Sequence, residues 1–105
     1  MPNILSRTIK GPRRVSAFWN ARSELDRLVA THRGHVMNKW NHYFEIYDRH
    51  FSRFRERECT LLEIGVAGGG SLDLWRRYFG PKARIFGLDN NPDCKRFESP
   101  GTHVF

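Results

Sequence analysis

The first half of the chain carries apolar residues at helical spacing, with charged residues between them. One series spans residues 15–29 and comprises Val15, Phe18, Ala21, Leu25, Leu28 and Val29. A second series comprises Trp40, Tyr43, Phe44, Tyr47, Phe51 and Phe54. Residues repeating in this way share one face of a helix. The pattern predicts helices over residues 16–31, before Gly34, and over residues 38–54, the latter with an aromatic face typical of core packing.

From Cys59 onward, short apolar runs alternate with glycine-rich turns. Residues 60–66 and 83–89 have the length and composition of buried strands, and residues 103–105 open a third. After the first run, three glycines precede Ser71, a good helix N-cap, and a helix is expected over residues 72–79. Its inward residues are expected to be Leu72, Trp75, Tyr78 and Phe79. A short helix is expected over residues 92–97, and the strand–helix–strand order predicts a parallel α/β unit.

These patterns divide the chain into three parts. Residues 1–14 carry Pro2, Gly11, Pro12 and three arginines, which predicts a flexible basic arm. Residues 15–58 are expected to form an N-terminal helical cap. Residues 59–105 form the strand–helix–strand unit.

The net charge of +7 lies mainly in the first half of the chain. Residues 1–58 hold 12 Lys and Arg against 6 Asp and Glu, whereas residues 59–105 hold 6 against 5. Acids interrupt the basic residues and no nucleic-acid motif accompanies them, so we do not expect a nucleic-acid partner. The basic half still leaves a non-catalytic binding module open as an alternative. Because the two cysteines lack metal-like spacing and no segment is apolar enough to span a membrane, we expect a soluble cytoplasmic protein.

The candidate chemistry lies at the end of the first predicted strand. Gly65 ends that strand, Gly68, Gly69 and Gly70 follow, and Asp89 ends the next strand. Glycine lets the backbone approach a ligand closely, and the following helix presents free N–H groups. Neighbouring parallel strands end at the same edge of a sheet, so the Asp89 carboxylate is placed to accept ribose hydroxyls. The pattern predicts an adenosine site.

Two kinds of adenosine cofactor fit this pattern. A dinucleotide fingerprint would have glycine at positions 65, 67 and 70, but residue 67 is Ala. Glu63 discriminates further, because a carboxylate about 4 Å from a phosphate charge costs on the order of 4 kcal/mol at an effective dielectric near 20. S-adenosylmethionine carries an ammonium and a sulfonium instead of phosphate. The pattern favours this donor, and an NAD(P)-binding oxidoreductase fragment remains the alternative.

The stretch from about Lys39 to Phe105 resembles class I S-adenosylmethionine-dependent methyltransferases. The similar group includes macrocin-type and rhamnosyl O-methyltransferases and proteins named cephalosporin hydroxylases. The residues that carry the resemblance are 39–51, 62–66, 69–72, Trp75, 78–80, 87–89, Pro92 and Cys94. The resemblance implies a larger Rossmann-like sheet, a bound methyl donor, and methylation of a hydroxyl on a sugar or a glycosylated small molecule. It also implies a divalent metal, commonly magnesium, and a histidine base.

The chain is shorter than this resemblance requires. The metal ligands and the base of such relatives come from later strands, so no catalytic or metal-binding residue is assigned. The predicted donor-binding residues are Glu63, Gly65, Val66, Gly68, Gly69, Gly70, Ser71, Asp89 and Asn90, with His42 and Tyr43 as candidate border residues. We expect an incomplete enzyme, inactive alone, that exposes an apolar sheet edge through which it forms homo-oligomers.

Overall fold

The second half of the chain is an α/β unit. The computed structural model describes residues 6–9, 21–35 and 37–105, with side chains described outside 6–9 and 38–42. The unit comprises strand β3 (Cys59–Ile64), helix α4 (Gly70–Phe79), strand β4 (Ala83–Leu88), the 3-10 helix η2 (Pro92–Phe97) and strand β5 (Thr102–Val104). The strands pair in parallel in the order β3-β4-β5. The predicted fold class and parallel pairing are confirmed.

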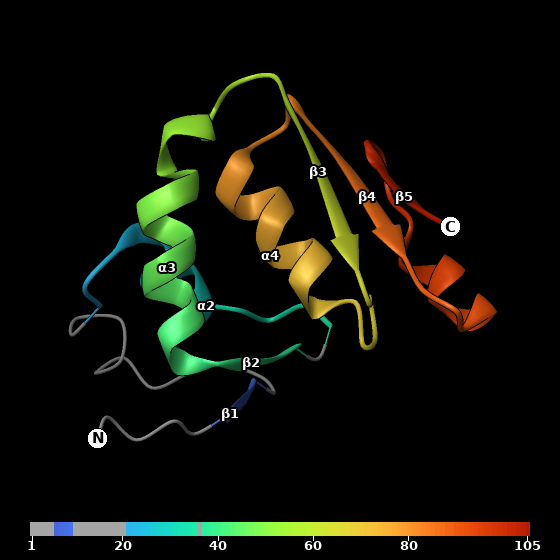
Figure 1. Cartoon of the computed structure of the whole chain (residues 1–105), viewed down its shortest axis with the longest axis horizontal. Coiled ribbons are helices and arrows are strands. Elements are labelled where there is room, and N and C mark those ends of the chain that lie inside the picture. The colour runs from blue at the N-terminus through green and yellow to red at the C-terminus, as the bar shows by residue number, and fades with distance from the viewer. Residues whose placement is uncertain (1–5, 10–20, 36) are drawn as a thin grey trace.

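Helices cover one face of this sheet. Helix α3 (Asn41–Phe51) and helix α4 lie on the same side of β3 and β4, with α4 nearer to the strands (Figure 1). Helix α2 (Glu24–Ala30) contacts both. Within the described residues, no helix is long and apolar enough to cross a membrane.

An antiparallel strand pair precedes α3. Strand β1 (Ser6–Ile9) pairs with strand β2 (Met37–Trp40), with Ile9 opposite Met37. The prediction of a helix from residue 38 was therefore wrong for residues 38–40, because pairing with a distant segment satisfies their backbone as a strand. Strand β1 also lies within the predicted flexible arm of residues 1–14. The helix predicted over residues 38–54 also ends earlier than expected, because α3 stops at Phe51 and residues Ser52–Phe54 form the 3-10 helix η1.

The first predicted helix is shorter in its described part. Residues 16–20 of that prediction lie outside the described residues, and α2 begins only at Glu24. Ser23 fixes this start because its Oγ accepts a hydrogen bond from the Asp26 N–H at 3.1 Å.

Three boundaries in the α/β unit also differ from the prediction. Strand β3 ends at Ile64 because Gly65 has a φ of +88°. The N-cap of α4 is Gly69 rather than Ser71, which is buried in the first helical turn. The segment Pro92–Phe97 is a 3-10 helix, capped by Asn91, whose side chain accepts from the Asp93 N–H.

Aromatic side chains join the two larger helices. The four predicted inward residues of α4 are buried, as is Phe44 of α3. The Tyr47 and Trp75 rings meet edge-on with centroids 5.0 Å apart, and Phe51 lies near Trp75 and Phe79. Most of the described aromatic side chains of residues 43–54 therefore belong to the hydrophobic core, and Phe54, at the end of the series, is exposed.

The opposite face of the sheet carries large apolar side chains that remain exposed. Their exposed fractions are 59% for Leu62, 78% for Ile64, 45% for Leu88 and 67% for Phe105. No described element covers this face. Strand β3 is also an edge strand, because β4 is its partner in the described sheet. We call the exposed surface formed by Leu62, Ile64, Leu88 and Phe105 the outer face.

Arg76 connects α4 to the starts of β4 and β5. Its Nη1 donates to the carbonyls of Gly80 (3.1 Å) and Ala83 (2.6 Å). Its Nη2 donates to the carbonyl of Gly101 (2.6 Å) and to Thr102 Oγ1 (3.2 Å). One guanidinium thereby satisfies four acceptors, two where the turn after α4 enters β4 and two at the start of β5, about 25 residues after Arg76 in the chain.

Replacing Arg76 should destabilise the fold more than replacing its neighbour. Arg76→Met removes four hydrogen bonds from a charged donor, and we expect a loss of about 2–3 kcal/mol in the free energy of unfolding. Arg77→Met removes the bonds of an exposed side chain to the Leu28 carbonyl and Thr31 Oγ1, and it should cost about 0.5 kcal/mol. Urea unfolding of both variants measures the difference. Equal losses would contradict the role given to Arg76.

Candidate methyl-donor site

Residues 65–70, which we call the glycine loop, join β3 to α4 with an unusual backbone. Three of its residues have positive φ angles: Gly65 (+88°), Ala67 (+49°) and Gly69 (+77°). Ala67 occupies the position where a dinucleotide fingerprint has glycine, and it adopts the left-handed conformation that glycine would adopt without strain. The loop is therefore held in a shape that its own sequence only partly favours.

Asp89 holds the glycine loop from the end of β4. Its Oδ2 accepts hydrogen bonds from the N–H groups of Val66 (2.8 Å) and Ala67 (3.0 Å). Its Oδ1 accepts from the Asn91 N–H at 2.9 Å. Hydrogen bonds from Asn91, Ala67 and Val66, in that order, lower the pKa of Asp89. The acid and the glycine loop are thus in direct contact, as the sequence predicted.

Two hollows adjoin Asp89 at the carboxyl ends of the strands. One, of about 550 Å³, is lined by Ile64, Gly65, Leu88, Asp89 and Asn90. The other, of about 320 Å³, is lined by Asp89, Asn91, Pro92, Lys95, Val104 and Phe105. A Cβ added to Gly65 would meet no atom within 4 Å, so the space beside this glycine is open. Asp89 therefore lines both hollows, and one of them it shares with Gly65.

The other predicted donor-binding residues differ in their burial and in the element that carries them. Glu63 is half-buried on β3, paired in register with Gly87, on the same face as Leu61. Val66 is buried, and a Cβ on Gly87 would lie 2.6 Å from it. Gly70 and Ser71 form the first turn of α4, which has no side-chain cap. Gly68 is half-buried within the loop, and Asn90 is exposed.

The two candidate border residues lie on α3. The side chain of His42 is outside the described residues. The Tyr43 ring meets the Tyr47 ring edge-on, with centroids 5.9 Å apart. The structure thus places Tyr43 against a neighbour in the helix layer, and a site role for either residue stays a prediction.

Two residues that the sequence analysis did not assign to the site also contact the glycine loop. Cys94 Sγ donates to the Ala67 carbonyl at 3.5 Å. The Phe97 ring lies so close to Gly69 that a Cβ there would be 2.5 Å from ring atoms. Both residues come from η2, which the sequence predicted only as a short helix. Their spacing in the sequence gave no signal for these contacts, because the contacts depend on how η2 packs against the glycine loop.

The described residues do not assemble a metal centre. Among them, no group of three His, Cys, Asp or Glu side chains lies close enough together to hold a metal ion. No residue of the described ranges is therefore assigned as a metal ligand.

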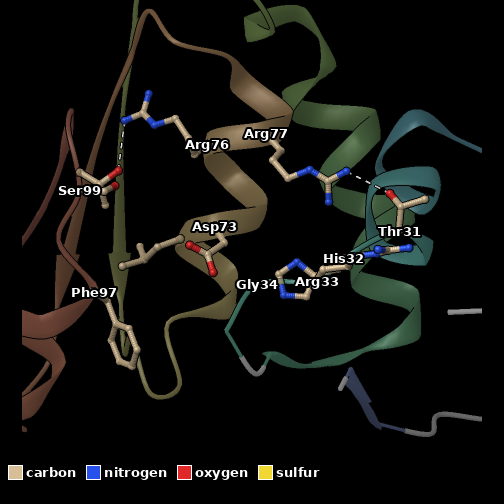
Figure 2. A pocket seen from close by; sticks show the side chains of 11 residues that line it. Thr31, His32, Arg33, Gly34, Asp73, Arg76, Arg77, Phe97 and Ser99 are labelled. Carbon is tan, nitrogen blue, oxygen red and sulfur yellow. Dashed lines mark hydrogen bonds between the residues drawn. The ribbon is translucent and has the colours of Figure 1, made fainter. Parts of the chain in front are cut away.

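A third pocket lies on the helix side of the sheet. It has a volume of about 540 Å³ and is lined by the loop after α2, by α4 and by residues before β5. In Figure 2, Asp73 lies between Phe97 on one side and His32 on the other. Asp73 Oδ2 accepts from the His35 N–H at 2.8 Å, so this acid stabilises the loop after α2. None of the lining residues belongs to the glycine loop.

A glycine turn after one parallel strand, with an acid at the end of the next, is the arrangement typical of nucleoside sites in Rossmann-like folds. No protein-family model matches the chain. Among curated proteins, it is 38% identical over 85 residues to 8-demethyl-8-(2-methoxy-alpha-L-rhamnosyl)-tetracenomycin-C 3'-O-methyltransferase of Streptomyces olivaceus, covering 74% of this chain and 22% of that protein. It is 36% identical over 80 residues to demethylmacrocin O-methyltransferase of Streptomyces fradiae, covering 67% of this chain and 19% of that protein.

A solved structure is similar as well. The methyltransferase MycE from the mycinamycin biosynthetic pathway, in complex with Mg and SAH, matches with a TM-score of 0.59 and 28% identity. The match covers 81% of this chain and 21% of MycE. The resemblance to sugar O-methyltransferases with a Rossmann-like fold is confirmed. The chain spans about a fifth of the length of these relatives.

The contact between Asp89 and the glycine loop should depend on pH. Because the folded pKa of Asp89 is lowered, its stabilising contribution is full above the ordinary aspartate pKa of about 4 and is lost as the pH falls through the lowered value. We expect the amide resonances of Val66 and Ala67 to titrate together below about pH 4. Asp89→Asn should abolish that transition. Amide shifts that stay flat in the original chain from pH 6 to pH 2 would contradict the contact.

Proposed function

We propose that this chain binds S-adenosylmethionine and forms the donor-binding part of an O-methyltransferase. The observation that carries the proposal is the Asp89 carboxylate seated against the glycine loop, with open space beside Gly65. The similarity to O-methyltransferases, and to a structure that contains SAH, supports the donor assignment.

The donor's nucleoside would lie across Asp89. A carboxylate has about four acceptor positions, and three N–H groups already use three of them. Ribose hydroxyls would therefore bind the remaining position and compete with the loop amides for the others. The hollow lined by Pro92, Val104 and Phe105 suits a purine ring. Glu63, near the end of β3, would favour the positively charged part of the donor.

The reaction proposed for the longer protein is methyl transfer to a sugar hydroxyl. The hydroxyl oxygen would attack the sulfonium methyl, the carbon–sulfur bond would break, and S-adenosylhomocysteine would leave as the hydroxyl proton passes to a base. A sugar-bearing small molecule is the proposed acceptor, since a similar MycE structure holds mycinamycin VI. We further propose that this chain alone does not catalyse the reaction, and that metal ligands and base come from outside it.

We also propose that the protein works in the cytoplasm. Both cysteines are free thiols, which suits a reducing compartment.

Calorimetry with three ligands tests the proposal. We expect the chain to bind S-adenosylmethionine and S-adenosylhomocysteine, and to bind NAD more weakly or not at all. Asp89→Ala should weaken donor binding by about tenfold or more, since hydrogen bonds to a charged group are lost.

The matched control for that variant is Asp93→Ala. Asp93 is an exposed acid four residues further along, so its removal changes the charge equally. Preference for NAD would favour the oxidoreductase alternative and overturn the proposal. Binding to RNA that falls steeply with salt, without donor binding, would favour the non-catalytic module instead.

The outer face and the free edge of β3 give a second testable expectation. We propose that the chain forms homo-oligomers through them, because exposed Leu62 and Ile64 lie on an edge strand. Sedimentation velocity should show association that increases with concentration, and Leu62→Thr should reduce it. Phe54→Thr removes an exposed aromatic ring on η1 and should leave association unchanged. A monomer at every concentration would be the contrary result.

A further inference from the structure

Ala67 is the least favourable residue of the glycine loop for the conformation it adopts. Its φ of +49° lies in the left-handed region, where a Cβ is penalised and glycine is not. Non-glycine residues persist there only when their surroundings hold them in place. The contacts made by Ala67 therefore decide the shape of the loop.

Both backbone polar groups of Ala67 are held by the segment that follows β4. Its N–H donates to Asp89 at 3.0 Å, and its carbonyl accepts from Cys94 Sγ at 3.5 Å. Burial and the nearby Asp89 carboxylate raise the pKa of the Cys94 thiol, which therefore keeps its proton and can donate. The side chain of Cys94 is 3% exposed, so its position is fixed by packing.

The segment that follows β4 also contacts the C-terminal end of the glycine loop. Phe97 packs against Gly69, the N-cap of α4, leaving no room for a Cβ. Asp89, Cys94 and Phe97 thus contact three consecutive parts of the loop: the amides of Val66 and Ala67, the carbonyl of Ala67, and the Cα of Gly69.

We propose that Cys94 is a positioning residue for the methyl donor, which holds Ala67 in its left-handed conformation and so keeps the glycine loop shaped for binding. This inference rests on the proposed function, because it assumes that the loop binds the donor. Cys94 acts through the carbonyl of Ala67 and through its hydrogen bond with Asp89, which in turn binds the Ala67 N–H.

The test measures whether a variant of Cys94 loses affinity for the donor and whether a second substitution, at Ala67, restores that affinity. Cys94→Ala should weaken S-adenosylhomocysteine binding by about two- to fivefold in calorimetry, the range expected for one weak hydrogen bond from a thiol. Ala67→Gly alone should change affinity little. In the double variant, Ala67→Gly should restore most of the lost affinity, because glycine adopts the left-handed conformation without help. Cys59→Ala, which removes the other thiol at the far end of β3, is the matched control.

Amide hydrogen exchange at Val66 and Ala67, measured without ligand, gives a second readout. Exchange should be faster in Cys94→Ala and return toward the original rate in the double variant. If Cys94→Ala does not fold, Cys94→Ser keeps a donor in place and should retain slow exchange. Unchanged affinity and exchange in Cys94→Ala, or a loss that Ala67→Gly leaves uncorrected, would overturn the inference. If the unaltered chain binds no donor, the proposed function fails, while the exchange rates still decide whether Cys94 holds the loop.

Discussion

The contact between the Asp89 carboxylate and the amides of Val66 and Ala67 is the interaction on which the site depends. It joins the ends of two strands, Ile64 and Leu88, that are 24 residues apart in sequence but adjacent in the sheet. An ionised carboxylate forms strong hydrogen bonds with backbone N–H groups, which offsets the strain of the left-handed Ala67. Asp89 and Gly65 also line the same hollow, so one residue both shapes the loop and borders open space where a ligand could bind. This double use constrains residue 89 to a short acidic side chain.

The rest of the fold keeps those strand ends in place. Helix α4 packs on one face of the sheet through Leu72, Trp75 and Phe79, and Arg76 connects its end to the starts of β4 and β5. The helix layer is anchored in turn by the aromatic contacts between α3 and α4. The other face of the sheet, with Ile64 and Phe105 exposed, has no such cover among the described residues. Among the described residues, the strand ends that carry the glycine loop and Asp89 are therefore held by packing on one face of the sheet only.

Local patterns predicted the α/β unit well because its elements are short, apolar and separated by glycines. The order of the strands, the helix after the glycine loop and the place of Asp89 after the second strand follow from the sequence pattern, although the first two strands end one or two residues earlier than predicted. Residues 37–40 were predicted incorrectly because their pairing with residues 6–9 is a long-range contact that periodicity does not encode. Ser71 was a plausible cap by residue type, but the positive φ of Gly69 moves the start of α4. The contacts of Cys94 and Phe97 with the loop depend on three-dimensional packing of η2, which no spacing rule gives.

A crystal structure of the chain with S-adenosylhomocysteine would test the central claim most directly. The account predicts that the ribose lies between Gly65 and Asp89, with at least one ribose hydroxyl bonded to the carboxylate and Ala67 still in its left-handed conformation. It also predicts that the adenine occupies the hollow beside Val104 and Phe105. A nucleoside bound elsewhere, or an Asp89 side chain turned away from both the ribose and the glycine loop, would contradict it.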